Sequence, residues 1–201
     1  MGKEKYLKDI EELFKKSFIV NISSIKRIIN KKNISRGYEK QLIRNLLLKN
    51  KIKKITKGYY TIYNDPSLSV FCFKSAYLGL QDALSFHNLW EQETIPIIIT
   101  TKKIRQGIRR VMEMNILIRR IDKKYFFGFN YFPENKFYFP YSDIEKTFID
   151  LVYFKENLSK EIIMNIIKEI DITKFNKYLR KYPKNFQKTM LNLLNMNSKI
   201  S

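Results

Sequence analysis

The chain is poor in the residues that build disulfides and zinc sites. Among its 201 residues, Cys72 is the only cysteine and His87 is the only histidine. A single cysteine excludes an intramolecular disulfide. One cysteine and one histidine are also too few for a zinc site within one chain, which needs three or four His or Cys ligands. The six glycines are scattered and form no phosphate-binding loop. We therefore expect a protein that uses neither a metal nor a cofactor.

Long apolar runs are also missing. No run approaches the roughly 18–20 residues that span a bilayer, and the charged segment 1–14 lacks the apolar stretch of a signal peptide. These absences predict a cytoplasmic protein with no membrane partner. The hydrophobic fraction of 44% is nevertheless ordinary for a chain that folds around a core.

Acidic residues are few. The chain has 19 Asp and Glu against 39 Lys and Arg, a net charge of +20. This excess indicates a polyanionic partner, although abundant Lys, Ile and Asn are also typical of an AT-rich genome. Residues 1–64 hold 17 basic and 5 acidic residues, a net of +12, while residues 65–201 hold the other 22 and 14, a net of +8. The charge is therefore concentrated in the N-terminal third.

Residues 1–64 show the spacing of helices followed by a hairpin. Segment 6–16 has apolar residues at helical intervals, and the polar cluster 21–24 can cap a second, short helix. Residues 52–63 form two β-rich runs around the turn Lys57-Gly58, which predicts a basic hairpin. The positions expected to face inward are Leu7, Ile10, Leu13 and Phe14 in the first helix, and Ile25, Ile28 and Ile29 in the second.

A third helix, for which Ser35 is the expected cap, carries the functional prediction. Its buried stripe is Leu42, Ile43, Leu46 and Leu47. The opposite face holds Gly37, Gln41, Arg44 and Asn45, with Tyr38 and Lys40 on the flanks. Helices followed by a basic hairpin predict a winged helix-turn-helix, with the third helix in the major groove of double-stranded DNA. A small helical bundle with a solvated basic surface is the alternative.

This arrangement predicts the residues that touch DNA. They are Ser35, Arg36, Tyr38, Lys40, Gln41 and Arg44 in the third helix, and Lys54, Lys57 and Tyr59 in the hairpin. Arg44 and Gln41 are the candidates for base edges, while lysines neutralise phosphates. A second basic cluster is predicted to contact the DNA backbone, RNA or only solvent, and it comprises Lys102, Lys103, Arg105, Arg109 and Arg110.

The turn-forming residues 64–67 predict a boundary between a DNA-binding domain, 1–64, and a second domain, 65–201. The second domain mixes a buried strand at 96–101 with paired strands at 116–121 and 125–129. A further strand at 136–139 is expected between Pro133 and Pro140. The segment Ser142–Glu145 predicts a capping box that opens a helix, and residues 159–196 predict helices that break near Asp171 and Pro183. The predicted class is α+β: an N-terminal winged helix-turn-helix and a mixed α/β domain with a helical tail.

The order of several segments resembles the AbiEi-type antitoxins of type IV toxin–antitoxin systems. The segments are Lys57–Tyr60, Ala76–Leu89, the strand ending in Thr100–Lys103, Phe126–Gly128 and Asp143–Leu151. The resemblance covers about residues 10–155. It implies a transcriptional regulator that represses its own operon, and a nucleotidyltransferase-like toxin countered without a stable complex. The second domain then serves antitoxicity, and the tail 155–201 is a departure.

Other functions fit parts of the sequence. Asp82, Ser85 and His87 lie within one helical turn, which does not make a catalytic triad, so His87 is expected to be a buried or half-buried structural residue. A metal-dependent nuclease or nucleotidyltransferase would use Asp143, Glu145, Lys146 and Asp150. A non-catalytic RNA-binding module and a protein-interaction adaptor are further alternatives. We predict a protein that is not an enzyme, with two copies on an inverted repeat as a plausible arrangement on DNA.

Overall fold

The computed structural model describes residues 5–30 and 37–198, which combine helices and strands in an α+β fold, as predicted. The chain divides into two compact units. The first is built from residues up to Cys72 and from residues 110–115, and the second from residues 73–109 and from 116 onward. In the described part, no helix is long and apolar enough to cross a membrane.

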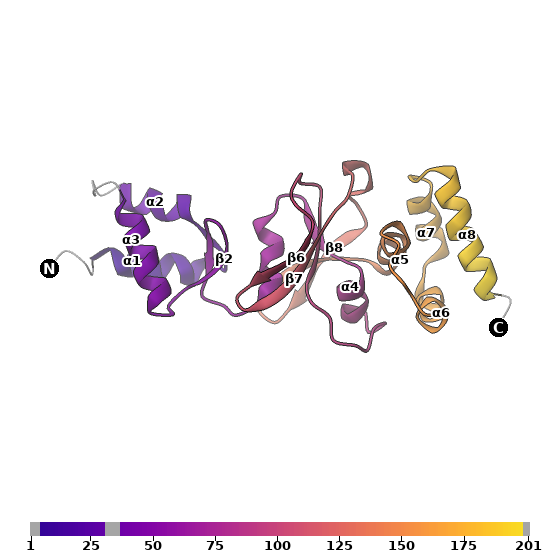
Figure 1. The fold of residues 1–201 in the computed structure, drawn as a ribbon, viewed down its shortest axis with the longest axis horizontal. Helices are drawn as coiled ribbons and strands as arrows, with labels where there is room; N and C mark the ends of the chain where they lie inside the picture. Colours follow the sequence, from indigo (N-terminus) through magenta and orange to yellow (C-terminus); the bar gives the residue numbers. More distant parts are fainter. Residues whose placement is uncertain (1–4, 31–36, 199–201) are drawn as a thin grey trace. The chain divides into compact units, whose positions relative to one another are not determined.

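Helices α1 (Lys5–Lys16), α2 (Ile22–Asn30) and α3 (Tyr38–Leu48) form the first unit around one core (Figure 1). The Asn21 side chain caps α2, because its Oδ1 accepts a hydrogen bond from Ser24 N at 2.8 Å. The spacing of apolar residues predicted the helical part of this core, but not Val20, Ile52 and Tyr60, which are also buried in it. Its buried members from the helices are Ile10, Phe14, Ile25, Ile29, Leu42, Ile43 and Leu46, whereas the predicted Leu7, Leu13, Ile28 and Leu47 are partly buried.

A three-stranded sheet completes the first unit. Strands β1 (Val20–Asn21), β2 (Lys53–Thr56) and β3 (Tyr59–Thr61) lie in the order β1-β3-β2. The predicted hairpin is confirmed: β2 and β3 pair antiparallel, and Gly58 in their turn has a φ of 82°, which a residue with a Cβ rarely adopts. After β3 the chain forms the 3-10 helix η1 (Pro66–Cys72).

The second unit contains a six-stranded sheet in the order β6-β7-β5-β4-β9-β8. The strands are β4 (Ala76–Leu78), β5 (Ile97–Thr100), β6 (Gly107–Val111), β7 (Met114–Arg120), β8 (Phe129–Glu134) and β9 (Phe137–Ser142). All four residues of β5 are buried, as expected for a central strand. Strand β5 pairs antiparallel with β4 and parallel with β7.

The predicted pairing of segment 116–121 with 125–129 is wrong. Residues 123–125 form the short 3-10 helix η2, whose start is capped by the Asp122 carboxylate, and the chain then crosses to the other edge of the sheet. There β8 pairs antiparallel with β9. Pro133 and Pro140 lie within these two strands rather than at their ends. Pro133 is tolerated because β8 is an edge strand, where one face of the backbone needs no partner.

Helices α4 (Gln81–Phe86) and α5 (Ile144–Tyr153) pack with the sheet, and α6 (Lys160–Glu169), α7 (Ile172–Leu179) and α8 (Lys184–Ser198) follow. The predicted breaks near Asp171 and Pro183 are confirmed. Helix α5 lies between the sheet and the helices α7 and α8 (Figure 1). The helical tail is therefore part of the main core, to which it contributes Ile166, Ile170, Phe175, Leu179, Tyr182 and Met190.

Candidate nucleic-acid interface

Helix α3 has one buried face and one polar face. Leu42, Ile43 and Leu46 are buried in the core of the first unit, and Leu47 is half-buried. The residues between them point to solvent, because a turn of 3.6 residues places positions 41, 44 and 45 opposite that stripe. The exposed residues of this polar face are Lys40, Gln41, Arg44 and Asn45.

The start of α3 differs from the predicted one. The N-cap position is Gly37, in a left-handed conformation with φ 98°, and it provides no side-chain cap. Instead the Gly37 N–H donates to the Glu39 carboxylate at 3.2 Å, and Glu39 lies 3.7 Å from Lys26 Nζ on α2. The expected cap Ser35 and the expected contact Arg36 lie outside the described residues.

The hairpin presents Lys54 and Lys57 as exposed side chains, with Tyr59 half-buried. Its tip is fixed to the start of α2, where the Ile22 N–H donates to the Gly58 carbonyl at 2.8 Å. Strand β1 pairs with β3, with Asn21 opposite Tyr59. The hairpin is therefore held to the helical core by backbone hydrogen bonds along both β1 and α2.

The residues of the second predicted basic cluster are divided between the two units. Arg105 and Arg109 belong to the second unit, where the Arg109 guanidinium donates to the Arg105 carbonyl at 2.7 Å. Arg110 belongs to the first unit and forms an exposed ion pair with Glu113 at 2.5 Å. Lys103 is exposed and Lys102 is half-buried. Part of this basic charge is thus neutralised or engaged locally.

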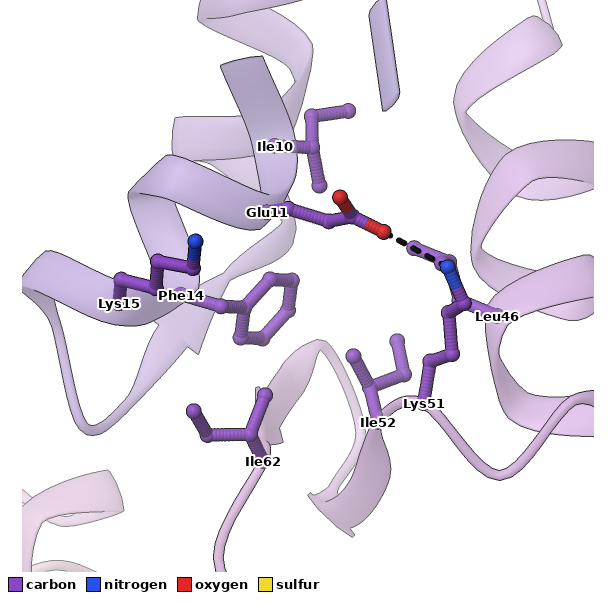
Figure 2. Close-up of a pocket in the computed structure, with 8 residues that line it drawn as sticks. All are labelled: Ile10, Glu11, Phe14, Lys15, Leu46, Lys51, Ile52 and Ile62. Atoms are coloured by element: carbon purple, nitrogen blue, oxygen red, sulfur yellow. Dashed lines mark hydrogen bonds and ion pairs between the residues drawn. The ribbon is translucent and has the colours of Figure 1, made fainter. Parts of the chain in front are cut away.

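Two cavities border α3, and both are lined in part by Leu46 and Lys51. One, of about 220 Å³, lies against its buried face among apolar side chains that include Phe14, Ile52 and Ile62 (Figure 2). Beside it, Glu11 on α1 and Lys51 after α3 form an ion pair at 2.7 Å. The other, of about 370 Å³, borders the polar face and is lined by Leu7, Tyr38, Gln41, Leu42, Asn45, Leu46, Lys49 and Lys51.

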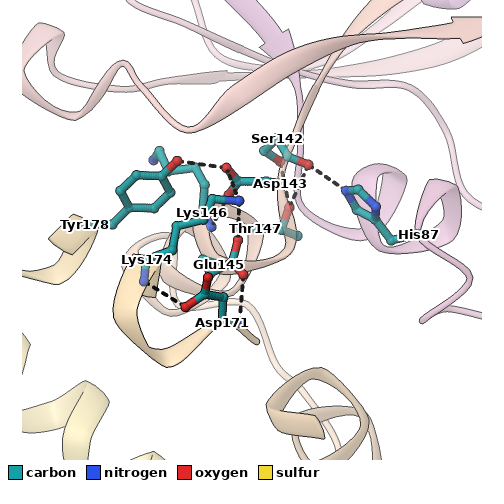
Figure 3. A network of polar contacts seen from close by, with 9 residues as sticks. All are labelled: His87, Ser142, Asp143, Glu145, Lys146, Thr147, Asp171, Lys174 and Tyr178. Carbon is teal, nitrogen blue, oxygen red and sulfur yellow. Dashed lines mark hydrogen bonds and ion pairs between the residues drawn. The ribbon is translucent and has the colours of Figure 1, made fainter. Parts of the chain in front are cut away.

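The predicted capping box at α5 is wrong in its residues. Asp143, not Ser142, is the N-cap: its Oδ1 accepts from Lys146 N at 2.9 Å. Glu145 is then free of the cap. Its Oε1 accepts from the backbone N–H of Asp171 at 2.9 Å, and its Oε2 lies 2.8 Å from Lys174 Nζ (Figure 3). The first residue of the predicted box was placed one position too early, because serine and aspartate cap equally well.

The side chains of Asp143, Glu145 and Lys174 form a polar cluster that joins α5 to α7. Asp143 Oδ2 accepts from the Tyr178 hydroxyl at 2.9 Å and lies 3.0 Å from Lys174 Nζ (Figure 3). Burial and the hydrogen bond to Asp143 raise the pKa of Tyr178 to about 12. Burial alone would raise the pKa of Glu145, but hydrogen bonds from Lys174 and from Asp171 N outweigh it and lower that pKa. Both carboxylates are therefore paired with the same lysine, Lys174.

A second buried pair lies one turn further along α5. The fully buried Lys146 ammonium contacts the fully buried Asp150 carboxylate and also donates to the Tyr182 hydroxyl at 3.2 Å. The Tyr77 hydroxyl donates to Asp150 Oδ2 at 2.6 Å. Burial lowers the pKa of Lys146 and raises that of Asp150, and each partner opposes this by favouring the charged form of the other.

The sequence did not predict this pairing of Lys146, Asp150 and the two tyrosines. The available signal was a lysine and an aspartate four residues apart in a short helix that also carries several large apolar residues. Tyr77 and Tyr182 are distant in sequence, and nothing local marks them. Gly128 also belongs here: its φ is 72°, and an added Cβ would lie 2.8 Å from Lys146 Cβ, so α5 packs directly on its backbone.

His87 is half-buried, as expected, and its Nε2 lies 2.8 Å from the Ser142 carbonyl oxygen (Figure 3). The carboxylates considered for a metal-dependent nuclease are engaged by protein groups: Asp143 and Glu145 by Lys174, and Asp150 by Lys146 and Tyr77. Within residues 5–30 and 37–198, no three His, Cys, Asp or Glu side chains are grouped so that they could hold a metal ion.

Comparison with solved structures finds a similar fold in the crystal structure of the RV2827C protein from Mycobacterium tuberculosis. The TM-score is 0.60, over 90% of this chain and 73% of the other. At 10% sequence identity, this likeness concerns the fold alone. No protein-family model matches the chain. The search of curated proteins gives no significant match.

Proposed function

We propose that this chain is a transcriptional regulator that binds double-stranded DNA through an N-terminal winged helix-turn-helix domain. The single observation that carries the proposal is the polar face of α3, where Lys40, Gln41, Arg44 and Asn45 are exposed opposite a buried apolar stripe. Side chains of this kind reach base edges when a helix lies in the major groove. The element order supports the same proposal, because α3 is followed directly by the β2–β3 hairpin.

The residues have different roles in this proposal. Arg44 and Gln41 contact bases, since Arg pairs bidentately with guanine and Gln with adenine. Lys40, Lys54 and Lys57 neutralise phosphates, which adds affinity without sequence preference. Tyr38 and Tyr59 are half-buried, so they contact DNA only through their exposed edges. The net charge of +12 in residues 1–64 attracts the duplex over a longer range.

We further propose that the regulator represses its own operon and serves as the antitoxin of a nucleotidyltransferase-like toxin, without a stable complex with it. This part rests on the resemblance to the AbiEi-type antitoxins. One winged helix reads one half-site, so two copies on an inverted repeat account for an operator of ordinary length. The second unit, with α5 held between the sheet and the helical tail, then carries the antitoxin role.

The test is the loss of affinity and sequence preference in Arg44→Ala, measured by fluorescence anisotropy on a duplex from immediately upstream of the gene. We expect affinity to fall by about 1–3 kcal/mol, with the preference over a scrambled duplex reduced. Lys188→Ala, at an exposed position on α8 of the second unit, removes the same charge from another helix and is expected to leave the preference unchanged. Equal behaviour of the two variants would overturn the assignment of α3 as the reading helix.

A further inference from the structure

Two amides on the polar face of α3 are linked to each other. Gln41 and Asn45 are one turn apart, both are exposed, and Gln41 Nε2 donates to Asn45 Oδ1 at 3.3 Å. Arg44 lies next to them on the same face. Asn45 was placed on this face by the sequence, but it was not among the predicted DNA contacts.

The internal hydrogen bond leaves the pair with a defined set of free groups. Gln41 keeps its Oε1 as an acceptor and one N–H of Nε2, and Asn45 keeps its Nδ2 as a donor and one lone pair of Oδ1. If both amides are reversed, the pair still offers one acceptor and one donor, carried by the opposite residues. The pair therefore presents a donor beside an acceptor in either orientation.

Only one base matches that pattern in the major groove. Adenine presents the N6 amino donor next to the N7 acceptor, whereas guanine presents two acceptors, cytosine a donor, and thymine an acceptor with a methyl group. We propose that Gln41 and Asn45 act together as the reader of one adenine, with Asn45 as a specificity-determining residue. This inference rests on the proposed function and specifies which base that same surface selects.

The surroundings of the pair favour this role. Leu42 and Leu46, which neighbour the pair in sequence, are anchored in the core and fix the orientation of the helix face. The mutual hydrogen bond reduces the number of side-chain rotamers that must be ordered when DNA binds. Lys49, which is exposed, lines the same cavity as the pair and can neutralise a phosphate that flanks a bound base.

The experiment selects duplexes from a pool with a randomised segment of about 20 base pairs, two helical turns, using the full-length chain. Wild type, Gln41→Ala, Asn45→Ala and the control Lys188→Ala are compared. Alanine favours helix, so the exposed substitutions on α3 are expected to keep the fold, which circular dichroism checks. We expect wild type and control to enrich the same site, with an adenine whose preference falls roughly 5- to 150-fold in Asn45→Ala and Gln41→Ala.

A second measurement ties the effect to the base atoms. Replacing that adenine by 7-deazaadenine removes N7, so wild type should lose affinity, while Asn45→Ala should lose little more than it has already lost. If wild type enriches a site but the adenine preference is unchanged in both variants, the adenine inference is overturned and the regulator proposal stands. If wild type enriches no sequence at all, both are overturned.

Discussion

At the scale of single residues, the Lys146–Asp150 pair is the most consequential feature of the second unit. Both side chains are fully buried, so each charge has lost its water and depends on its partner and on the hydroxyls of Tyr77 and Tyr182. A buried pair of this kind contributes little net stability as a pair, but removing one member leaves an unpaired charge in the core. The pair therefore fixes how α5 is oriented against β4 and the tail.

Replacing Lys146 by methionine should be strongly destabilising. We expect Lys146→Met to lower the free energy of unfolding by about 3–5 kcal/mol, because Asp150 stays buried without its cation. Urea denaturation measures the loss. The matched control is Lys168→Met, at an exposed position on α6, with an expected change within about 0.5 kcal/mol. The double variant Lys146→Met/Asp150→Leu should recover part of the loss, and a recovery of nothing would argue against an unpaired charge as the cause.

The lowered pKa of Glu145 predicts that the free energy of unfolding decreases at acid pH. Its pKa in the folded chain is lower than the ordinary value of 4.5, so the folded state favours the ionised form. The resulting stability is present above pH 4.5 and is lost as the pH falls through the lower, folded pKa. In Glu145→Gln, which cannot ionise, the decline in unfolding free energy over this range should be shallower than in wild type. Denaturation series at several pH values compare the two, and parallel curves would contradict the assignment.

At the scale of elements, the helical tail is a structural part of the second unit rather than an appendage. Phe175 on α7 is fully buried and packs on Phe148 of α5, with ring centroids 6.1 Å apart. Tyr182, before α8, stacks on Tyr125 at 4.1 Å. The polar cluster of Asp143, Glu145 and Lys174 adds ion pairs between α5 and α7. The tail therefore covers a face of α5 that would otherwise be exposed.

This packing gives a direct test on α7. Phe175→Ala should lower the free energy of unfolding by about 3–5 kcal/mol, because it removes a large side chain from the core and leaves a cavity. Ile172→Ala, on the same helix but at a residue that is 51% exposed, is the control and should cost far less. Thermal or urea unfolding followed by circular dichroism measures both. Equal, small losses would show that the tail does not belong to the core.

Local sequence patterns predicted some elements well and others badly. The helices α1 to α3 and α6 to α8 follow from local signals within a few residues, namely apolar spacing and, at α2, α6 and α7, a polar cap. The predicted pairing of 116–121 with 125–129 failed because β7 pairs instead with β5, an earlier strand in the chain. Strand partners are chosen by the whole sheet and not only by adjacency in sequence. Asp122 caps the start of a 3-10 helix rather than forming a hairpin turn, and Pro133 lies within an edge strand rather than at its end.

In the candidate sites, too, some features could be predicted from local sequence and others could not. The polar face of α3 was predictable, because helical geometry alone assigns Gln41 and Arg44 to the side opposite Leu42 and Leu46. The bond between Gln41 and Asn45 depends on rotamers that a sequence does not specify. The network around Lys146 depends on tyrosines that are 69 positions before it and 36 after it in the sequence, so only the tertiary fold brings it together.

At the scale of the whole molecule, the chain combines a strongly basic N-terminal unit with an α+β unit whose core holds buried charges. The basic unit alone would bind any polyanion, and that binding weakens steeply with salt. The account claims more than this: the face of α3 selects a sequence. Affinity by itself does not separate the two possibilities, whereas the ratio between a specific and a scrambled duplex does.

The most direct test is therefore binding of the full-length chain to the DNA immediately upstream of its own gene, measured against a scrambled duplex and an RNA at several salt concentrations. The account predicts binding to the upstream DNA at least about a thousandfold tighter than to either competitor, and a preference that persists at physiological salt. Equal binding to all three, falling with salt along the same slope, would contradict it, since charge alone would then explain every contact.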